Sequence, residues 1–216
     1  MRVSFLGCGR RGSFHAWYAQ RAGHTVTLWG RAGSAHLSEL REMRTNEFLI
    51  LPEEIRLTDD LAAAVRTAEI VTISIHAQAL RSFLRDLRAQ GLREEMANKY
   101  VILCMKGLEI GTGKRLTTVV HEELGAEIKP VVWVGPGHVQ DFVRGIPNCM
   151  VLAGEDREAL HTLVDVLGSP LIRFYYGEDL LGTEVGAAAK NVIGLAAGML
   201  DGLGYGSLKG ALMARG

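Results

Sequence analysis

The segment Arg2–Gly12 reads Arg-Val-Ser-Phe-Leu-Gly-Cys-Gly-Arg-Arg-Gly, so a short apolar run leads directly into three glycines spaced as G-x-G-x-x-G. The apolar residues predict a buried β-strand, and the residues after the glycines have a helical pattern. In such a unit Gly7 allows the tight turn, Gly9 lets the backbone approach a pyrophosphate, and Gly12 lets the helix pack on the strand. N–H groups at the start of the helix face the anion. The segment therefore predicts a phosphate cradle for a dinucleotide.

The residues beside this cradle indicate which dinucleotide it holds. Arg10 and Arg11 add positive charge near the phosphates, or else lie in solvent. The strand expected at Thr25–Trp29 is soon followed by Arg31, at the place where an enzyme selective for NAD puts an acidic residue against the ribose 2′-hydroxyl. A guanidinium can instead stack on adenine and pair with a 2′-phosphate. We expect NAD(P)H as cofactor, with NADP somewhat favoured; the alternative is that Arg31 is only an exposed surface residue.

Strand-like and helix-like runs alternate through the first 177 residues. The expected strands are Arg2–Leu6, Thr25–Trp29, Ile70–Ile75, Tyr100–Cys104, Val131–Val134, Cys149–Ala153 and Leu171–Tyr175. The expected helices lie near Ser13–Ala22, Ala35–Arg44, Leu61–Arg66, Leu80–Gln90, Arg115–Leu124, Val139–Arg144 and Arg157–Leu167. This alternation predicts an α/β fold of the Rossmann type, a doubly wound and mostly parallel sheet with helices on both faces. We assign residues 1–177 to this dinucleotide-binding domain.

The pattern changes over Glu178–Leu203, where no strand signal occurs and Ala, Gly and Leu fill one long helical stretch. Gly194, Gly198 and Gly202 recur there at every fourth position. Glycine destabilises a helix by roughly 0.5–1 kcal/mol relative to alanine, so we expect another backbone to approach this face closely. Residues 178–216 are predicted to be the first part of an all-helical substrate domain.

Composition excludes several classes of partner. Lys plus Arg and Asp plus Glu number 24 each, so no global field attracts nucleic acid or an anionic membrane. The chain has no signal segment and no apolar run of the roughly 18 residues that a membrane span needs, so a cytoplasmic location is expected. Cys8, Cys104 and Cys149 lie in or beside apolar runs and are expected to be reduced and structural. No metal-ligand spacing links these cysteines or the histidines, and no metal is expected.

Two lysines are candidates for chemistry. Lys106 follows the strand expected at Tyr100–Cys104, and α/β folds bind ligands at the carboxyl ends of their strands. Lys190 lies among Ala, Val, Ile and Leu in the late helix, where a buried ammonium is unfavourable unless it has a partner or a role. Taken singly, each lysine is more often a solvated surface group.

A series of short motifs runs through the whole chain. The motifs are the glycine fingerprint, Trp29-Gly30-Arg31, Lys106-Gly107-Leu108-Glu109, Gly135-Pro136 followed by Arg144-Gly145-Ile146-Pro147, Glu184-Val185-Gly186, Lys190-Asn191-Val192-Ile193, and Asp201-Gly202-Leu203-Gly204-Tyr205-Gly206. In this order the chain resembles the bacterial NAD(P)-dependent sn-glycerol-3-phosphate dehydrogenases. The last two blocks make the resemblance specific, because the glycine fingerprint alone is shared by many dehydrogenases.

This resemblance implies a reaction and a set of site residues. The reaction is the interconversion of dihydroxyacetone phosphate and sn-glycerol 3-phosphate by hydride transfer with NAD(P)H, which supplies glycerol phosphate for phospholipid synthesis. Lys190 is implied as the proton acceptor and donor, and Lys106 as a contact to substrate and to the nicotinamide side. Gly135 and Gly137 are implied to bind substrate, and Val139 to bind cofactor. Because burial and a second ammonium lower the pKa of a lysine, we expect the two lysines to form a mutually depressing pair.

The sequence departs from the family pattern at several positions. Gly137 stands where Ser or Thr is common, Val139 where Ala is common, and Arg11 where an aromatic residue is usual. Ser207-Leu208 replaces a common Asp-Asn, with one residue fewer. These differences bear on fine substrate contacts more than on the reaction. Family members also continue into a longer helical domain that supplies further substrate contacts, so we expect a truncated chain that is itself inactive.

Two other functions stay open. One is a different reductase with the same Rossmann-plus-helical plan, of the ketopantoate or 6-phosphogluconate type, which turnover of another substrate would reveal. The other is a catalytically silent dinucleotide-binding module, which nucleotide binding without turnover would favour. The expected partner is a small phosphorylated triose, with no nucleic acid and no membrane span, and a homodimer is left open.

Overall fold

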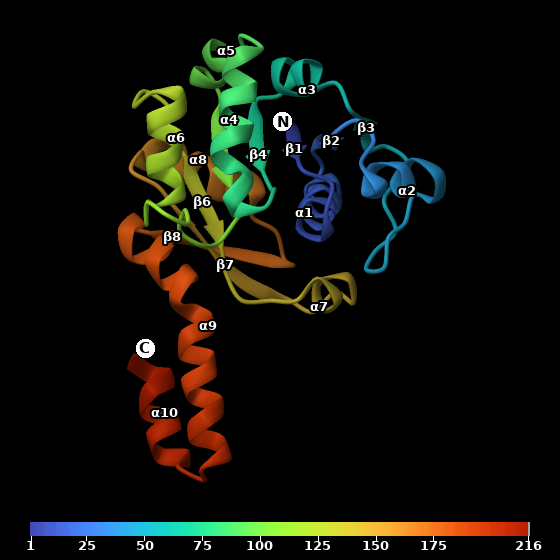
Figure 1. Ribbon diagram of the computed structural model, residues 1–216. Coiled ribbons are helices and arrows are strands. Elements are labelled where there is room, and N and C mark those ends of the chain that lie inside the picture. The colour runs from blue at the N-terminus through green and yellow to red at the C-terminus, as the bar shows by residue number, and fades with distance from the viewer. Residues whose placement is uncertain (216) are drawn as a thin grey trace.

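The structure is a computed structural model that describes residues 1–215, and its centre is an eight-stranded sheet (Figure 1). The strands lie in the order β3-β2-β1-β4-β5-β6-β7-β8. Their bounds are β1 Arg2–Leu6, β2 Thr25–Trp29, β3 Arg56–Thr58, β4 Ile70–Ile73, β5 Tyr100–Leu103, β6 Val131–Val134, β7 Asn148–Ala153 and β8 Ile172–Gly177. Neighbouring strands are parallel, except that β6 and β7 run antiparallel. The predicted Rossmann-type, mostly parallel sheet is confirmed.

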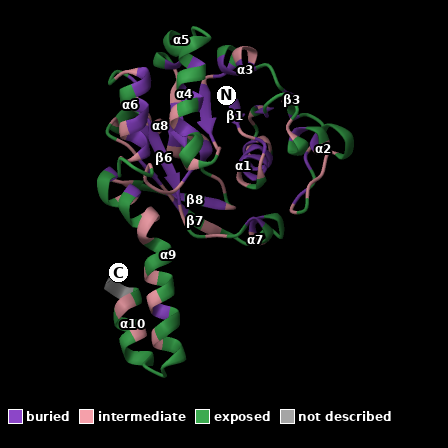
Figure 2. Cartoon of the chain, viewed as in Figure 1, coloured by how far each residue is buried: buried purple, intermediate pink, exposed green. Residues whose placement is uncertain are grey.

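Helices cover both faces of this sheet, as a doubly wound fold requires. The helices are α1 Arg10–Arg21, α2 Ala35–Met43, α3 Leu61–Thr67, η1 Ala77–Ala79, α4 Leu80–Ala89, α5 Arg93–Ala97, α6 Leu116–Leu124, α7 Val139–Val143, α8 Arg157–Leu167, α9 Leu180–Gly202 and α10 Gly206–Arg215. Apolar side chains of α1, α2, α7 and α8 form one core, and those of α3, α4, α5 and α6 form a second. Figure 2 shows the buried residues gathered in the sheet and on the helix sides that face it.

The first strand shows why the sequence reads as a continuous apolar run. Phe5 belongs to the first core and Leu6 to the second, because successive side chains of a strand point to opposite faces. A strand that is buried on both faces needs apolar residues at every position rather than at alternate ones. Parallel strands also bring their carboxyl ends to one edge of the sheet, which here carries Gly7 after β1 and Lys106 just beyond β5.

Three short elements were not predicted, namely β3, α5 and the three-residue helix η1. Strand β3 has three residues, Arg-Leu-Thr, which is too short to show an alternating pattern, and it forms because β2 offers a free edge beside it. Helix α5 has five residues and buries Met96 alone, so it carries no apolar periodicity. The predicted strands and helices otherwise match, with ends that differ by a few residues.

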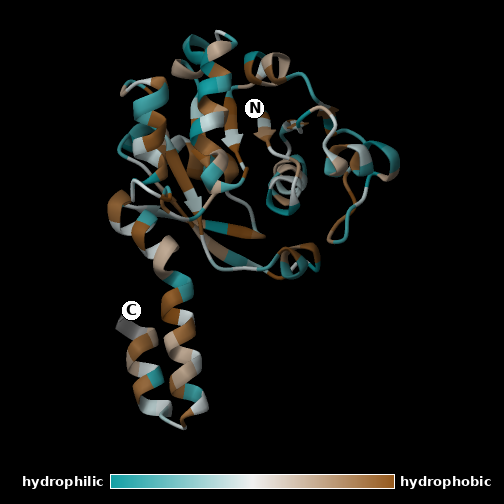
Figure 3. Ribbon diagram, viewed as in Figure 1, coloured by the Kyte–Doolittle hydropathy of each residue, from teal (hydrophilic) through white to brown (hydrophobic). Residues whose placement is uncertain are grey.

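The late helical stretch forms α9, whose first turn is capped by Asp179 through a 2.8 Å hydrogen bond from Gly182 N. Its beginning lies against the sheet, whereas its remainder extends away from it with α10 beside it (Figure 1). Apolar side chains on this extension are exposed. Figure 3 shows these hydrophobic residues, in brown, along both α9 and α10. The close backbone approach expected at Gly194, Gly198 and Gly202 is wrong for the described residues, since a Cβ at each would meet no atom within 4 Å.

The cysteines differ from one another. Cys8 and Cys104 are buried, as predicted, but Cys149 is exposed. Side chains alternate along β7, so Cys149 points away from the face on which its neighbour Met150 is buried. The prediction that all three are structural core residues is therefore wrong for Cys149. Among the described helices, none is both long and apolar enough to cross a membrane.

Candidate active site

The glycine turn after β1 has no room for side chains at two of its three glycines. Gly7 adopts a φ of +122°, and a Cβ there would lie 2.2 Å from the Ser74 carbonyl oxygen. A Cβ on Gly12 would lie 1.7 Å from the Gly7 carbonyl oxygen, so the first turn of α1 can pack against the glycine turn only if residue 12 has no side chain. Gly9 differs, because its φ of −73° is ordinary and a Cβ there would point into open space. Gly9 thus leaves the space above the start of α1 free for a ligand.

A cavity of about 760 Å³ opens over this turn, within the range of about 300–1,000 Å³ that is common for small-molecule and cofactor sites. It brings together six residues predicted to bind the cofactor, namely Gly7, Gly9, Arg10, Arg11, Arg31 and Lys106. Gly12 packs beneath the turn and does not line the cavity. Ser34 and His36 join Arg31 where the chain leaves β2 and enters α2.

Gly137 and Val139 line a second cavity, of about 200 Å³, which shares Arg10 and Arg11 with the larger one. The two cavities are therefore neighbours on either side of these arginines. Gly135 lines neither of them. A Cβ at Gly135 would lie 3.0 Å from the Cα of Met150, so this glycine allows the chain to pass close to β7.

Arg10 links two segments across the smaller cavity. Its guanidinium donates a 2.9 Å hydrogen bond to Gln140 Oε1 on α7 and lies 4.0 Å from the ring centre of Phe48, between α2 and β3. A guanidinium stacked on an aromatic ring and bonded at one edge keeps further donors for a phosphate. Arg10 can therefore contribute charge to the cavity while its position is fixed by both neighbours.

The two predicted lysines lie close enough for their charges to interact. Burial, then the charges of Arg11 and Lys190, lower the pKa of Lys106 below its ordinary value of 10.5. Lys106 is half-buried, but Lys190 is exposed, so the expectation of a buried ammonium at Lys190 is wrong for the described residues. The cause is the direction of α9, which extends away from the sheet beyond its first turns (Figure 1).

Two family models cover most of the chain. The model described as NAD-dependent glycerol-3-phosphate dehydrogenase N-terminus matches residues 2–160, and the model for the C-terminus of the same enzyme matches residues 179–216. The chain belongs to this dehydrogenase family. The boundary between the two matches falls just before α9, where the alternation of strands and helices ends.

Relatives named glycerol-3-phosphate dehydrogenase (NAD(P)+) match along the whole chain. The enzyme of Thermoanaerobacter sp. is 37% identical over 222 residues, which are 100% of this chain and 64% of its own length. The enzyme of Geobacillus kaustophilus is 38% identical over 99% of this chain and 63% of its own length. The crystal structure of glycerol-3-phosphate dehydrogenase from Coxiella burnetii superposes with a TM-score of 0.83 at 26% identity, over 99% of this chain and 65% of that one. The chain thus spans just under two thirds of the length of these dehydrogenases.

A buried carboxylate that was not predicted joins the parts of the chain that the two family models match. Glu184 on α9 accepts hydrogen bonds from Thr117 N at 3.1 Å, Thr117 Oγ1 at 2.6 Å and Arg115 Nη1 at 3.0 Å. It therefore binds the first turn of α6, whose backbone N–H groups lack partners within their own helix. The sequence signals were its place in the family motif Glu184-Val185-Gly186 and its position as an acidic residue in an apolar helical stretch.

A second unpredicted residue lines the smaller cavity. His15 on α1 is buried, its ring centre is 4.4 Å from that of Trp133, and its Nδ1 has no hydrogen-bond partner in the described chain. Burial, with a smaller contribution from the charge of Arg11, lowers the pKa of His15 to about 3. His15 is therefore a neutral imidazole at the wall of the cavity lined by Gly137 and Val139. Within the sequence it stands in the run Phe-His-Ala-Trp, which reads only as a core helix.

Proposed function

We propose that this chain forms the cofactor site and one side of the substrate site of an enzyme that interconverts dihydroxyacetone phosphate and sn-glycerol 3-phosphate with NAD(P)H. The observation that carries the proposal is the cavity of about 760 Å³, which unites the glycine turn, Arg31 and Lys106 in a chain of this family. Relatives whose names specify NAD(P)+ support the same cofactor. Residues 1–177 would be the dinucleotide-binding domain and residues 178–216 the first part of the helical substrate domain.

The cavity suits a dinucleotide at each of its parts. The open space at Gly9 and the N–H groups at the start of α1 would hold the pyrophosphate, with Arg10 and Arg11 adding charge. Arg31 would stack on the adenine and pair with a 2′-phosphate, so NADP(H) is favoured. Val139 would pack against the other end of the cofactor. When bound, the nicotinamide supplies or accepts the hydride.

The two lysines would carry the proton and the charge of the reaction. Reduction of the C2 carbonyl of dihydroxyacetone phosphate generates an alkoxide, which nearby ammonium groups stabilise. Lys190 would donate the proton to this oxygen and accept it in the reverse direction. Lys106 would hold the substrate beside the cofactor, with the main chain at Gly135 and Gly137 on the opposite side. The lowered pKa of Lys106 fits this placement, because it reflects burial first and then the neighbouring positive charges of Arg11 and Lys190.

Two measurements test this function. Titration of NADPH into the 216-residue chain, followed by cofactor fluorescence, should show saturable binding. Hydride transfer is then measured by NADPH oxidation with dihydroxyacetone phosphate, on this chain continued by the remaining C-terminal part of the Geobacillus relative. Binding without turnover in the continued protein would favour the silent module, and turnover of a different ketone would favour another reductase.

A further inference from the structure

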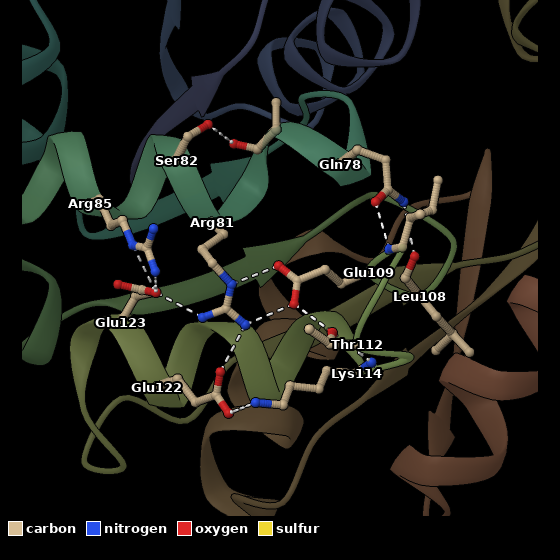
Figure 4. Close-up of polar contacts among 12 residues, drawn as sticks. Gln78, Arg81, Ser82, Arg85, Leu108, Glu109, Thr112, Lys114, Glu122 and Glu123 are labelled. Atoms are coloured by element: carbon tan, nitrogen blue, oxygen red, sulfur yellow. Dashed lines mark hydrogen bonds and ion pairs between the residues drawn. The ribbon is translucent and has the colours of Figure 1, made fainter.

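The loop that follows β5 is tied to the wall of the large cavity. We call residues Lys106–Arg115 the Lys106 loop. Gln78 in η1 donates from Nε2 to the Leu108 carbonyl oxygen at 2.9 Å and accepts at Oε1 from Ile110 N at 2.8 Å (Figure 4). One amide side chain thus fixes two backbone groups of the loop, one on either side of Glu109. Gln78 also lines the large cavity, as does Lys106.

About one turn further along the chain, Arg81 holds the same loop by its side chain Glu109. Arg81 Nε donates to Glu109 Oε1 at 2.6 Å and Arg81 Nη2 donates to Glu109 Oε2 at 2.8 Å, a two-point pairing that sets orientation as well as distance (Figure 4). The remaining donors of Arg81 reach Glu122 and Glu123 on α6. Hydrogen bonds from Arg81, then from Thr112, lower the pKa of Glu109 to about 2, so the pair is charged at all ordinary pH values.

The loop needs these external contacts because its own backbone is permissive. Gly107, Gly111 and Gly113 have φ values of +121°, +88° and +67°, a region that only glycine enters readily. A chain with three such positions has many conformations when it is free, and each fixed contact removes part of that freedom. Internally the loop is closed by backbone hydrogen bonds from Glu109 N to the Lys114 carbonyl oxygen and from Gly113 N to the Glu109 carbonyl oxygen. Its far end is held from outside by the pairs Lys114–Glu122 and Arg115–Glu184. Gln78 and Arg81 hold the part of the loop nearer to Lys106.

We propose that Gln78 and Arg81 are positioning residues for Lys106, which hold its loop against the wall of the cofactor cavity. The use of Lys106 in the reaction rests on the proposed function, whereas its placement by these two residues does not. The same chain offers matched comparisons on the same helix. Arg85 and Arg88 also pair with Glu123, but within the described residues neither has a hydrogen bond or ion pair to the Lys106 loop.

The test is the titration of Lys106 in the 216-residue chain without cofactor or substrate. Lysines are labelled with ¹³C at Cε, the Lys106 signal is identified by its loss in Lys106→Arg, and its chemical shift is followed against pH. In the wild type the signal should titrate below the ordinary value of 10.5. In Arg81→Gln and in Gln78→Ala the pKa should rise toward that value, because the released loop lets the ammonium reach water and leave Arg11. Arg85→Gln is the control and should keep the wild-type titration.

Melting curves separate positioning from a general loss of structure. Gln78→Ala and Arg85→Gln should melt within about 4 °C of the wild type, the shift that about 1 kcal/mol produces in a domain of this size, whereas Arg81→Gln, which loses hydrogen bonds to three carboxylates, should melt lower. If Arg81→Gln does not fold, Gln78→Ala decides alone, since Gln78 is exposed and buries no charge. An unchanged Lys106 titration in a folded Gln78→Ala variant overturns the proposal.

Turnover then shows whether the placement matters for the reaction. In the protein continued by the Geobacillus segment, Arg81→Gln and Gln78→Ala should raise KM and lower kcat together, reducing kcat/KM by about ten- to hundredfold, as displacement of a reacting group does. Arg85→Gln should not. If the unmodified continued protein has no turnover while the Lys106 titration shifts as expected, the proposed function fails and the positioning role stands.

Discussion

The buried carboxylate of Glu184 accepts a 2.6 Å hydrogen bond from the hydroxyl of Thr117, which is itself buried in the first turn of α6. The two residues are 67 positions apart in the sequence. Helix α9 carries Lys190 one and a half turns beyond Glu184, and α6 begins where the Lys106 loop ends. This carboxylate therefore ties the helix that carries Lys190 to the helix that begins at the end of the Lys106 loop.

Replacement of Glu184 by Gln should destabilise the fold. The amide keeps the shape of the carboxylate but cannot accept from Thr117 and Arg115 at both of its ends, and a buried polar group left without a partner costs about 1–3 kcal/mol. The free energy of unfolding, from urea denaturation, should fall by that amount. Glu178→Gln is the control, because Glu178 is exposed and pairs with Arg157 only at 3.9 Å. Equal stability of the two variants would contradict the role of Glu184.

The glycine turn predicts two substitutions with opposite outcomes. Gly9→Val should fold and melt like the wild type, because its Cβ enters open space, yet NADPH binding should be lost because the pyrophosphate needs that space. Gly12→Ala should lower the free energy of unfolding by about 1–3 kcal/mol or more, since its Cβ would overlap a backbone oxygen that cannot move freely. Calorimetry and NADPH titration on both variants separate the two effects. Unchanged NADPH affinity in Gly9→Val would remove the cradle assignment.

Arg31→Asp should shift cofactor preference from NADPH toward NADH. The aspartate repels a 2′-phosphate and can accept from a ribose hydroxyl, so the dissociation constant for NADPH should rise by about ten- to hundredfold while that for NADH falls or stays the same. Fluorescence titration with each cofactor gives the ratio. Arg56→Asp is the control, because Arg56 is an exposed arginine on β3 that does not line the cavity. The same ratio in Arg31→Asp and wild type would mean that Arg31 is only a surface residue.

In the protein continued by the Geobacillus segment, Lys190→Ala should lower kcat by at least about a hundredfold, the lower end of general acid–base contributions. NADPH affinity should stay nearly unchanged, because the cofactor cavity is lined by residues up to Lys106. Lys106→Ala should instead weaken substrate binding and turnover together. Steady-state kinetics distinguish the two patterns, with Lys209→Ala on α10 as a matched loss of one helical ammonium. A kcat near that of the wild type in Lys190→Ala would show that the proton comes from another group.

His15 should make the fold sensitive to acid. Its pKa is about 3 in the folded chain and 6.5 when unperturbed, so between these values the unfolded chain binds more protons and stability falls as pH falls. From about pH 7 to about pH 5 this loss amounts to about 2 kcal/mol. His15→Leu should remove that part of the pH dependence, whereas His161→Leu, at an exposed position, should retain it. Urea denaturation at both pH values measures the difference, and equal slopes in wild type and His15→Leu would contradict the assignment.

The parts of this molecule that the sequence predicts are those set by neighbouring residues. The strand, the turn at Gly7 and the start of α1 lie within twelve residues of one another, and their geometry follows from residue size and backbone freedom. Lys106 could be placed at the cavity because the carboxyl ends of parallel strands meet at one edge. The family resemblance added Gly137, which no local pattern singles out, and a role for Lys190, which its apolar surroundings had marked only as a candidate.

The parts that escaped prediction depend on contacts between distant residues. Gln78 and Ile110 are 32 positions apart, and nothing in either segment indicates that they meet. The exposure of Lys190 follows from the direction in which α9 leaves the sheet, which an apolar composition does not encode. The antiparallel pairing of β6 with β7 likewise depends on the path of the chain around α7 rather than on the residues of either strand.

The two ends of the large cavity offer different opportunities for evolutionary change. At the turn, Gly7 and Gly12 meet backbone with no space for a single methyl group, so any substitution there destabilises the fold and is selected against. At the other end Arg31 and His36 are exposed side chains that no neighbouring core constrains. In a lineage that carries this fold, residues at the Arg31 end can therefore change one at a time and shift the preference between NAD and NADP. Each intermediate protein still folds, and the glycine turn is inherited unchanged.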